Sequence, residues 1–344
     1  MTAIGFQTRI LSLLLNANQR MDLQHLSQIC QFAVKLLTLW IGFEKGLGVY
    51  SLLAAQAAGW LTLIVVQFAA CVKTKVLPRR GQWGRATRSR FKEMFWFGAD
   101  VFWVALGTQL INSSQTIVVS RAQGLDAAAV WAVGTKSFAL VCQLLWRISA
   151  MSGPIFSEMY ARDEKARLWD RYRILFQIVS AFAGLCAVIF AFANGPFFIL
   201  LSDGKAGMVW PAHYTWLLAL WLIPQAQQGF HSSLILVIKQ IRALKHVYFG
   251  EGVVFVVVGA ILAERVGLGA MIMWSSICTM IFTFSYSVWR VRGVTGASYS
   301  DILWEWQKPL LGMLLVVAPL GCVIEWAVQG RGPWIQFLSH IVIL

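Results

Sequence analysis

The sequence contains 344 residues, of which 58% are hydrophobic and only 13% are charged, and its formal net charge at pH 7 is +14. A soluble domain of this length has no interior large enough for so much apolar surface, so the composition excludes a soluble globular protein and predicts an integral membrane protein. The positive charge does not indicate a nucleic-acid partner, because the cations lie in short loops between apolar segments rather than on one face of a soluble domain.

Motifs for enzyme chemistry are absent from the sequence. The six cysteines all lie in apolar segments and form no CxxC pair, so we expect neither a disulfide framework nor a metal site. No GxxxxGK[ST], HExxH or GxSxG motif occurs, and no loop is long enough to fold as a separate catalytic domain. We therefore predict a protein that is not an enzyme, with no catalytic residues and no cofactor.

Nine apolar segments are each long enough to cross the ~30 Å hydrocarbon core of a bilayer at ~1.5 Å per residue. They are predicted at residues 23–42, 46–72, 94–117, 128–151, 174–193, 212–237, 247–262, 268–288 and 309–328. Shorter apolar pieces at residues 1–20 and 334–344 are interpreted as partial helices. The predicted fold class is therefore an all-α integral membrane protein with about nine complete transmembrane helices and a partial helix at each end.

The segment Lys73–Lys92 sets the predicted orientation of these helices. It holds eight Lys or Arg residues and no acid, and by the positive-inside rule it is predicted to be a cytoplasmic loop. With this loop inside, the loops assigned to the cytoplasmic side hold 19 cations and the loops assigned to the outside hold five. This asymmetry supports the layout of alternating spans.

Polar side chains inside the predicted spans are the candidate site residues, because such groups are costly in hydrocarbon and normally face a neighbouring helix or a wet cavity. They recur at helical spacing, which places each set on one face of its helix. The three sets are Gln24, Gln28, Gln31, Lys35 and Thr38 in residues 23–42, Asp100, Thr108, Asn112 and Gln115 in residues 94–117, and Lys136, Gln143 and Arg147 in residues 128–151. Two interpretations stay open for the amides: they line a cavity, or they join helices by hydrogen bonds at ~0.6–2 kcal/mol each.

Charged members of these sets divide by depth. Lys35 and Lys136 are both predicted ~9–12 Å below the outer face, and no acid lies at a matching depth to neutralise either. We expect them to hold an anionic group inside a cavity. Asp100 and Arg147 lie near the inner ends of neighbouring antiparallel spans, so we expect either an ion pair that closes the fold or side chains that extend to the nearby membrane interface.

The predicted span at residues 212–237 has a polar centre, PQAQQGFHSS, near the bilayer midplane. Pro224 removes a backbone hydrogen bond, and the freed carbonyls together with Gln225, Gln228 and His231 need partners or water. We therefore predict that this helix lines the same cavity. His231 also has a second interpretation, as a buried packing residue.

The spans after Val247 contain few ionisable groups. Glu251 and Glu325 are both predicted near helix ends, so these later helices are interpreted as lipid-facing support.

Residues 97–173 resemble a known family. They combine an FGA start, a polar QLINSSQT end, a short turn, a VWAVGTKSF helix and a PIFSEMYARDEKARL exit. This pattern resembles the opening helices of the C-terminal lobe of Wzx-type polysaccharide flippases, which belong to the multidrug/oligosaccharidyl-lipid/polysaccharide (MOP) exporter superfamily. Residues 18–22, NQRMD, followed by a span and a GF..GLG turn, resemble the last two helices of the N-terminal lobe.

The resemblance implies a two-lobed MOP/MATE-like bundle around a central cationic cavity in the bacterial cytoplasmic (inner) membrane. Residues 1–72 would form a remnant of the N-terminal lobe, 73–93 the cytoplasmic loop between lobes, 94–289 the C-terminal lobe, and 290–344 additional helices. It also implies about four further helices before Leu23, so that the N-terminal lobe of this chain would be incomplete.

The implied activity is the flipping of a polyprenyl-pyrophosphate-linked oligosaccharide by alternating access, for lipopolysaccharide O-antigen or exopolysaccharide biosynthesis. The implied partners are that lipid-linked glycan, the lipid bilayer, and polysaccharide polymerase or assembly proteins. Lys136, with Lys35 and Arg147, would hold the pyrophosphate, and Asp100 would couple transport to ions or membrane potential. The full predicted cavity set is Lys35, Lys136, Arg147, Gln31, Asn112, Gln115, Gln143, Gln225, Gln228 and His231.

Three other functions stay open. A drug/cation antiporter of the same superfamily would favour acids in the cavity, whereas the deep charges here are lysines. An integral-membrane glycan enzyme, such as a polymerase or acyltransferase, would favour a large periplasmic loop or a reactive His/Arg arrangement. A purely structural membrane subunit is the third alternative.

Overall fold

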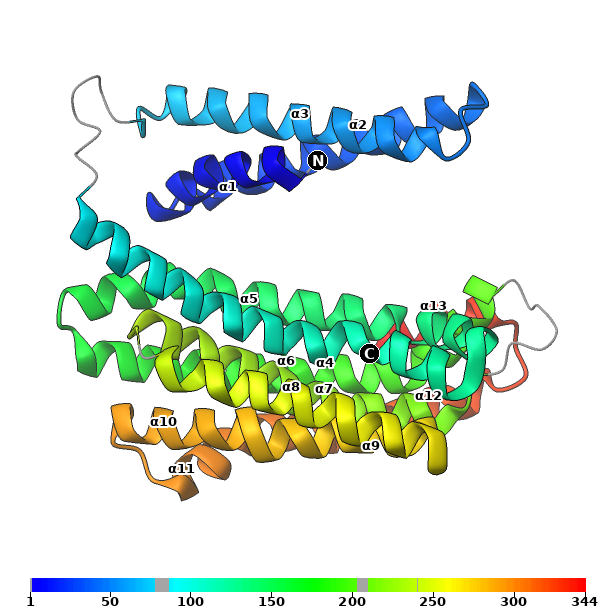
Figure 1. Cartoon of the computed structure of the whole chain (residues 1–344). Coiled ribbons are helices and arrows are strands. Elements are labelled where there is room, and N and C mark those ends of the chain that lie inside the picture. Colours follow the sequence, from blue (N-terminus) through cyan, green and yellow to red (C-terminus); the bar gives the residue numbers. More distant parts are fainter. Residues whose placement is uncertain (1, 78–86, 203–209, 240) are drawn as a thin grey trace. The chain divides into compact units, whose positions relative to one another are not determined.

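The computed structural model describes residues 2–77, 87–202, 210–239 and 241–344. Regular structure within these residues is entirely helical, which confirms the all-α prediction (Figure 1). In the described part of the chain, eight helices are long and apolar enough to cross a bilayer, so the protein is a multi-pass membrane protein. Residues 78–86, the centre of the predicted cytoplasmic loop, lie outside the described residues.

The chain divides into two units, residues 1–91 and 92–344. Unit 1 contains α1 (Thr2–Ala17), α2 (Met21–Glu44) and α3 (Tyr50–Lys73). Helices α2 and α3 approach closely at Gly42, where an added Cβ would lie 2.7 Å from Cβ of Ser51. Deeper in the pair, Nε2 of Gln67 donates to Oγ of Ser27 at 3.2 Å. Within this unit, small residues and buried amides therefore hold the helices together.

Unit 2 begins at Lys92, inside α4 (Arg88–Gly134), which is two helices joined at Gly124. Gly124 has φ 90° and ψ 176°, a conformation that glycine adopts because it has no Cβ. This break lies at the predicted turn between the spans 94–117 and 128–151. The chain continues through α5 (Lys136–Ala161), α6 (Lys165–Ser202), α7 (Ala212–Val237) and α8 (Ile241–Arg265).

The next membrane-crossing segment, Leu268–Thr295, contains a change of helix type. It consists of α9 (Leu268–Thr279), a single π-helical turn η1 (Met280–Phe284) and α10 (Ser285–Thr295). The chain then forms the short helices α11 (Tyr299–Leu303) and η2 (Glu305–Gln307), followed by α12 (Lys308–Val328) and α13 (Pro333–Ile343). Helices α12 and α13 both pack against α6.

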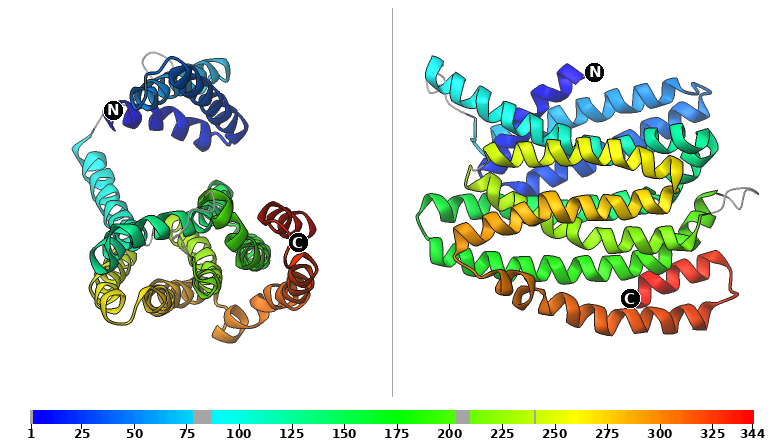
Figure 2. Two further views of the ribbon diagram at one scale, coloured as in Figure 1. Left: turned by 90° about the vertical axis from the view of Figure 1, so that its right-hand side faces the viewer. Right: turned by 60° about the horizontal axis from the view of Figure 1, so that its bottom comes forward.

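Helix α7 is the central helix of unit 2. It packs against α5, α6, α9, η1 and α10, and the end-on view in Figure 2 shows it in the interior of this unit. Its bounds match the span predicted at residues 212–237, yet it is not among the eight helices with the hydropathy of a membrane span. The difference from nine predicted spans has a physical cause: a helix surrounded by other helices contacts little lipid, so it tolerates amides, a proline and a histidine.

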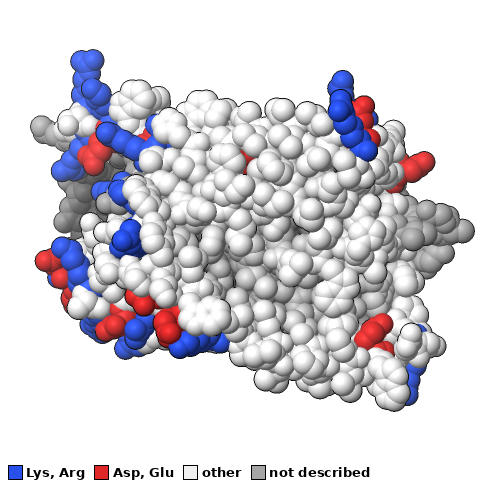
Figure 3. All heavy atoms as spheres, turned by 90° about the horizontal axis from the view of Figure 1, so that it is seen from below, with Lys and Arg blue, Asp and Glu red and all other residues white. Residues whose placement is uncertain are grey.

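Charged side chains are unevenly distributed along the helices. On the face shown in Figure 3, Lys, Arg, Asp and Glu gather toward the two ends, and the belt between them is almost free of charge. An uncharged belt flanked by charged ends is the surface expected of helices that cross a bilayer.

Candidate functional site

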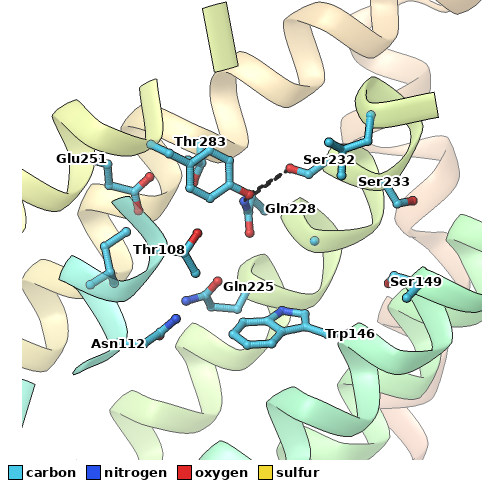
Figure 4. A pocket seen from close by; sticks show the side chains of 15 residues that line it. Thr108, Asn112, Trp146, Ser149, Gln225, Gln228, Ser232, Ser233, Glu251 and Thr283 are labelled. Atoms are coloured by element: carbon cyan, nitrogen blue, oxygen red, sulfur yellow. Dashed lines mark hydrogen bonds between the residues drawn. The ribbon is translucent and has the colours of Figure 1, made fainter. Parts of the chain in front are cut away.

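A polar cavity of about 280 Å³ lies between α4, α5, α7, α8 and η1 in unit 2 (Figure 4). Nine of its fifteen lining residues carry an amide or a hydroxyl, although most of the surface exposed to the cavity is apolar, with Trp146 on one side. The polar lining residues are Thr108, Asn112, Ser149, Gln225, Gln228, Ser232, Ser233, Tyr248, Glu251 and Thr283.

A second hollow of about 240 Å³ adjoins this cavity, since Thr108, Asn112 and Trp146 line both. It continues along α4 and α5 past Gln115 and Gln143. The two together form a polar wall that follows the facing sides of α4 and α5. We refer to both as the α4–α5 hollow.

Helix α4 supplies its polar stripe to this hollow, because it crosses α8 in close backbone contact. A Cβ added to Gly107 would clash with the backbone of Tyr248, and one added to Gly252 would lie 2.9 Å from the carbonyl oxygen of Gly107. The two glycines allow the helices to touch, as small residues do in membrane helix pairs. This contact brings Thr108 to the same cavity as Tyr248 and Glu251.

The amides of α7 divide between two roles. Gln225 and Gln228 line the cavity, and Nε2 of Gln228 donates to the hydroxyl of Tyr248, which lies 3.0 Å from Oγ of Ser232 (Figure 4). Gln227 faces elsewhere: its Nε2 donates to Oε1 of Gln307 at 2.7 Å and to Oγ of Ser180 at 3.3 Å. Gln227 therefore joins helices, while Gln225 and Gln228 form the wall of the cavity.

The structure places His231 outside the cavity lining. It is fully buried, its Nδ1 lies 2.5 Å from the hydroxyl of Tyr172, and its ring stacks on Phe176 with centroids 4.6 Å apart. The interpretation of His231 as a packing residue therefore describes it, and its assignment to the cavity is corrected. Residue 231 lies three positions after Gln228, so local spacing placed it on nearly the same face of the helix. Its contact with Tyr172 of α6 instead holds the imidazole ring in the aromatic core.

Glu251 lines the cavity, whereas the sequence predicted it near the end of a lipid-facing helix. Because α8 begins at Ile241 rather than near Val247, Glu251 lies well inside the helix and is only 1% exposed. Its Oε1 accepts a hydrogen bond from Oγ1 of Thr279 at 3.1 Å, while its Oε2 has no hydrogen-bond partner among the described residues. An acid between Gly250 and Gly252 in an apolar helix is the sequence signal that could have identified it.

Glu251 also lies beside a π-helical turn of the backbone, η1. Thr279, which donates to it, also accepts from Nε1 of Trp221 at 3.1 Å, and it directly precedes the π-helical turn η1. Thr283 from that turn lines the cavity beside Glu251. Single π turns inside α-helices are frequent at functional sites. Within the described lining of the α4–α5 hollow, Glu251 is the one Asp, Glu, Lys, Arg or His residue.

Asp100 has a different partner from the one expected. Its Oδ1 lies 2.5 Å from Nζ of Lys245, and the two side chains are only 14% and 23% exposed. This pair links α4 to α8, and the predicted pair of Asp100 with Arg147 stays a prediction. Lys245 falls between the predicted spans 212–237 and 247–262, whereas the structure places it in the first turns of α8.

The predicted cavity cations lie outside the lining of the α4–α5 hollow. Lys136 is the first residue of α5 and is exposed, as is Arg147, whereas Gln143 on the same stripe lines the hollow. In unit 1, Lys35 is half-buried, and it lies with Gln31 against Gly59 of α3, where an added Cβ would be 3.5 Å from Cβ of Lys35. The convergence of Lys35 and Lys136 on one anion stays a prediction.

Within the described residues, no three His, Cys, Asp or Glu side chains are grouped as metal ligands. These features define the class: a multi-pass, all-α membrane protein with an internal polar hollow. The chain belongs to the polysaccharide biosynthesis protein family, since the family model described as "Polysaccharide biosynthesis protein" matches residues 6–205, more than half of its length. No curated protein and no solved structure matches the chain. Family membership connects this membrane protein with the synthesis or export of polysaccharides.

Proposed function

We propose that this protein moves a polyprenyl-pyrophosphate-linked oligosaccharide across the bacterial cytoplasmic membrane, as a flippase for surface polysaccharide. The observation that supports it best is the α4–α5 hollow, whose wall combines amides and hydroxyls with the rings of Trp131, Phe138 and Trp146. Amides and hydroxyls match the hydroxyl groups of a sugar, and aromatic faces pack against its apolar C–H surface. The hollow therefore suits a glycan.

The phosphates of the substrate would be held next to the hollow rather than inside it. Lys136, Gln143 and Arg147 lie on one stripe of α5, at ~1.5 Å of rise per residue, so the two cations flank Gln143 at distances of ~10 and ~6 Å along the helix. In this proposal Gln143 contacts the glycan, and the cations attract the pyrophosphate. Alternating access by movement of helical units would then carry the headgroup across, with residues 73–92 on the cytoplasmic side.

Coupling to an ion is assigned in this proposal to Glu251 rather than Asp100. Asp100 is neutralised by Lys245, whereas the carboxylate of Glu251 has one oxygen without a partner and faces the cavity. A proton or a cation at Glu251 would change the charge of the cavity wall, and so the relative stability of the conformations that the wall adopts.

The proposal is tested with the full chain in liposomes that carry a fluorescent polyprenyl-pyrophosphate-linked oligosaccharide. We expect the protein to make the inner-leaflet glycan accessible to an external glycosidase, and Gln143→Ala to slow this transfer at least tenfold. Leu144→Ala, which removes an exposed apolar side chain from the same helix, is the matched control and should transfer at the wild-type rate. Protein-independent transfer, or equal rates for all three proteins, would contradict the proposal.

Drug/cation antiport is the second candidate function, and one observation favours it. The acid in the described hollow is Glu251, and acids in the cavity are what a carrier of cationic compounds requires. Proton-driven uptake of ethidium into the same liposomes, abolished by Glu251→Gln and accompanied by no lipid transfer, would select the antiporter over the flippase.

A further inference from the structure

A hollow of about 430 Å³ lies at the end of α10 and shares no lining residue with the α4–α5 hollow. It is lined by Trp289, Arg290, Arg292, Gly293, Gly296, Ala297 and Ser298. This segment closes the membrane-crossing stretch Leu268–Thr295, and Trp289 and the nearby Tyr299 are 51% and 41% exposed. Exposed Trp and Tyr at the end of a span are typical of the membrane–water interface.

The two arginines in this hollow are held in place by aromatic rings. The guanidinium of Arg292 lies over Tyr299 at 4.5 Å from the ring centroid, and that of Arg290 lies 5.7 Å from the ring centroid of Trp289. Stacking on a ring satisfies the face of a guanidinium and leaves the N–H donors at its edge available for an anion.

Donor capacity is left over at Arg290. Its Nε is buried and has no hydrogen-bond partner among the described residues, and neither arginine forms an ion pair within that part of the chain. A buried N–H without an acceptor is costly, and a charged one more so. Because protein atoms cover this N–H, an anion in the hollow would be bound by the other N–H donors of the two guanidinium groups.

The acid nearest in sequence, Asp301, is hydrogen-bonded and lines a different hollow. Asp301 accepts a hydrogen bond from the backbone N–H of Ser298 at 2.9 Å, and its own N–H donates to Oγ of Ser298 at 3.0 Å. Asp301 lines a separate hollow with Asp170 and Glu305, and the two hollows share only the turn residues Gly296 and Ala297. The carboxylates would repel an anion from their own hollow, so we expect an anion to bind in the hollow that contains the two arginines.

We propose that the hollow at Arg290 and Arg292 binds the phosphate of a membrane lipid headgroup. The two guanidinium groups supply charge and forked donors, which suit phosphate oxygens, and the exposed ring of Trp289 lies against the upper part of the acyl chains. The lipid is an anionic phospholipid of the bilayer, bound beside the α9–α10 segment that carries the π-helical turn. The site is separate from the transported glycan, so it does not depend on the flippase assignment.

The test measures lipid retention by native mass spectrometry on the purified full chain, with phosphatidylglycerol, a polyprenyl phosphate and inorganic phosphate as separate probes. We expect phosphatidylglycerol to bind the wild type, and Arg290→Gln/Arg292→Gln to weaken that binding at least tenfold. Arg171→Gln/Arg242→Gln is the matched control, because it removes two exposed arginines and leaves the hollow unchanged. Arg290→Lys keeps the charge but loses the forked N–H donors of the guanidinium group, and should weaken binding severalfold.

The outcomes separate the sources of the phosphate. Loss of phosphatidylglycerol in the test variant but not in the control supports the proposal, and competition by polyprenyl phosphate alone would assign the site to the polyprenyl lipid instead. Equal retention by the test and control variants would overturn the proposal. Displacement of phosphatidylglycerol by inorganic phosphate at the same concentration would also overturn it, because the site would then bind a soluble anion.

Discussion

The ammonium group of Lys245 lies 2.5 Å from the carboxylate of Asp100, and this ion pair joins the first part of α4 to the start of α8. The same two helices touch about two turns further along, at Gly107 and Gly252. An ion pair and a glycine contact together fix the crossing that forms one corner of the cavity. Asp100 is thus a structural residue in this arrangement.

Removing one partner of this pair is expected to destabilise the protein. Asp100→Asn leaves Lys245 partly buried without its counter-ion, and we expect a loss of about 1–3 kcal/mol. The double variant Asp100→Asn/Lys245→Gln should recover most of that loss, which a double-mutant cycle of thermal unfolding in detergent would measure. If Asp100→Asn abolished transport without lowering the unfolding temperature, Asp100 would be the coupling residue after all.

Contact between α4 and α8 at Gly107 gives a second prediction. Gly107→Ala places a methyl group against the backbone of Tyr248, which cannot rotate away as a side chain would. We expect overpacking to lower the free energy of unfolding by about 1–3 kcal/mol. The unfolding temperature and the yield of folded protein should fall with it. Gly98→Ala is the control on the same helix, because an added Cβ there meets no atom within 4 Å. Equal stability of the two variants would show that the helices do not touch at this point.

Glu251 gives a prediction about function. Glu251→Gln removes the carboxylate but keeps an oxygen that accepts from Thr279, so the fold should be retained. We expect transport, assayed in liposomes with an imposed ion gradient, to fall at least tenfold while the unfolding temperature changes little. Glu264→Gln, an exposed acid on the same helix, is the control and should transport normally. Wild-type transport by Glu251→Gln would exclude a coupling role.

The differences between prediction and structure concern contacts distant in sequence. Periodicity placed Thr108, Asn112 and Gln115 on one face of a helix, and all three line the α4–α5 hollow. Such a pattern depends only on the spacing of residues within one helix, so the sequence alone is enough to predict it. The partner of Asp100 is 145 positions away, and local spacing favoured Arg147 because it lies on the neighbouring span.

The start of α8 shows why Glu251 was interpreted as support. The two cations Arg242 and Lys245 precede the apolar segment, so the predicted span starts at Val247 and leaves Glu251 near its end. In the structure α8 begins at Ile241, because the ammonium of Lys245 is paired with Asp100 and is therefore tolerated within the helix. Tertiary pairing of one lysine thus changes the depth assigned to an acid six residues later.

His231 provides the last prediction. If it is a packing residue, its substitution lowers stability, and if it lines the cavity, its substitution lowers transport. Its ring lies in an aromatic cluster with Tyr172 and Phe176, and the hydroxyl of Tyr172 is bonded to its Nδ1. Tyr172→Phe leaves that nitrogen unsatisfied in a buried site, at about 1–3 kcal/mol, and His231→Phe leaves the tyrosine hydroxyl unsatisfied at a similar cost. In the double variant both polar groups are gone, so the losses should not add.

Thermal unfolding of the four proteins measures this coupling, and transport normalised to folded protein should be the same in all of them. A packing histidine affects stability and leaves transport intact, because it does not line the α4–α5 hollow. Gln228→Leu is the comparison from the same helix: it changes the cavity wall and should reduce transport. A loss of transport in His231→Phe that Tyr172→Phe does not share would return His231 to the cavity set.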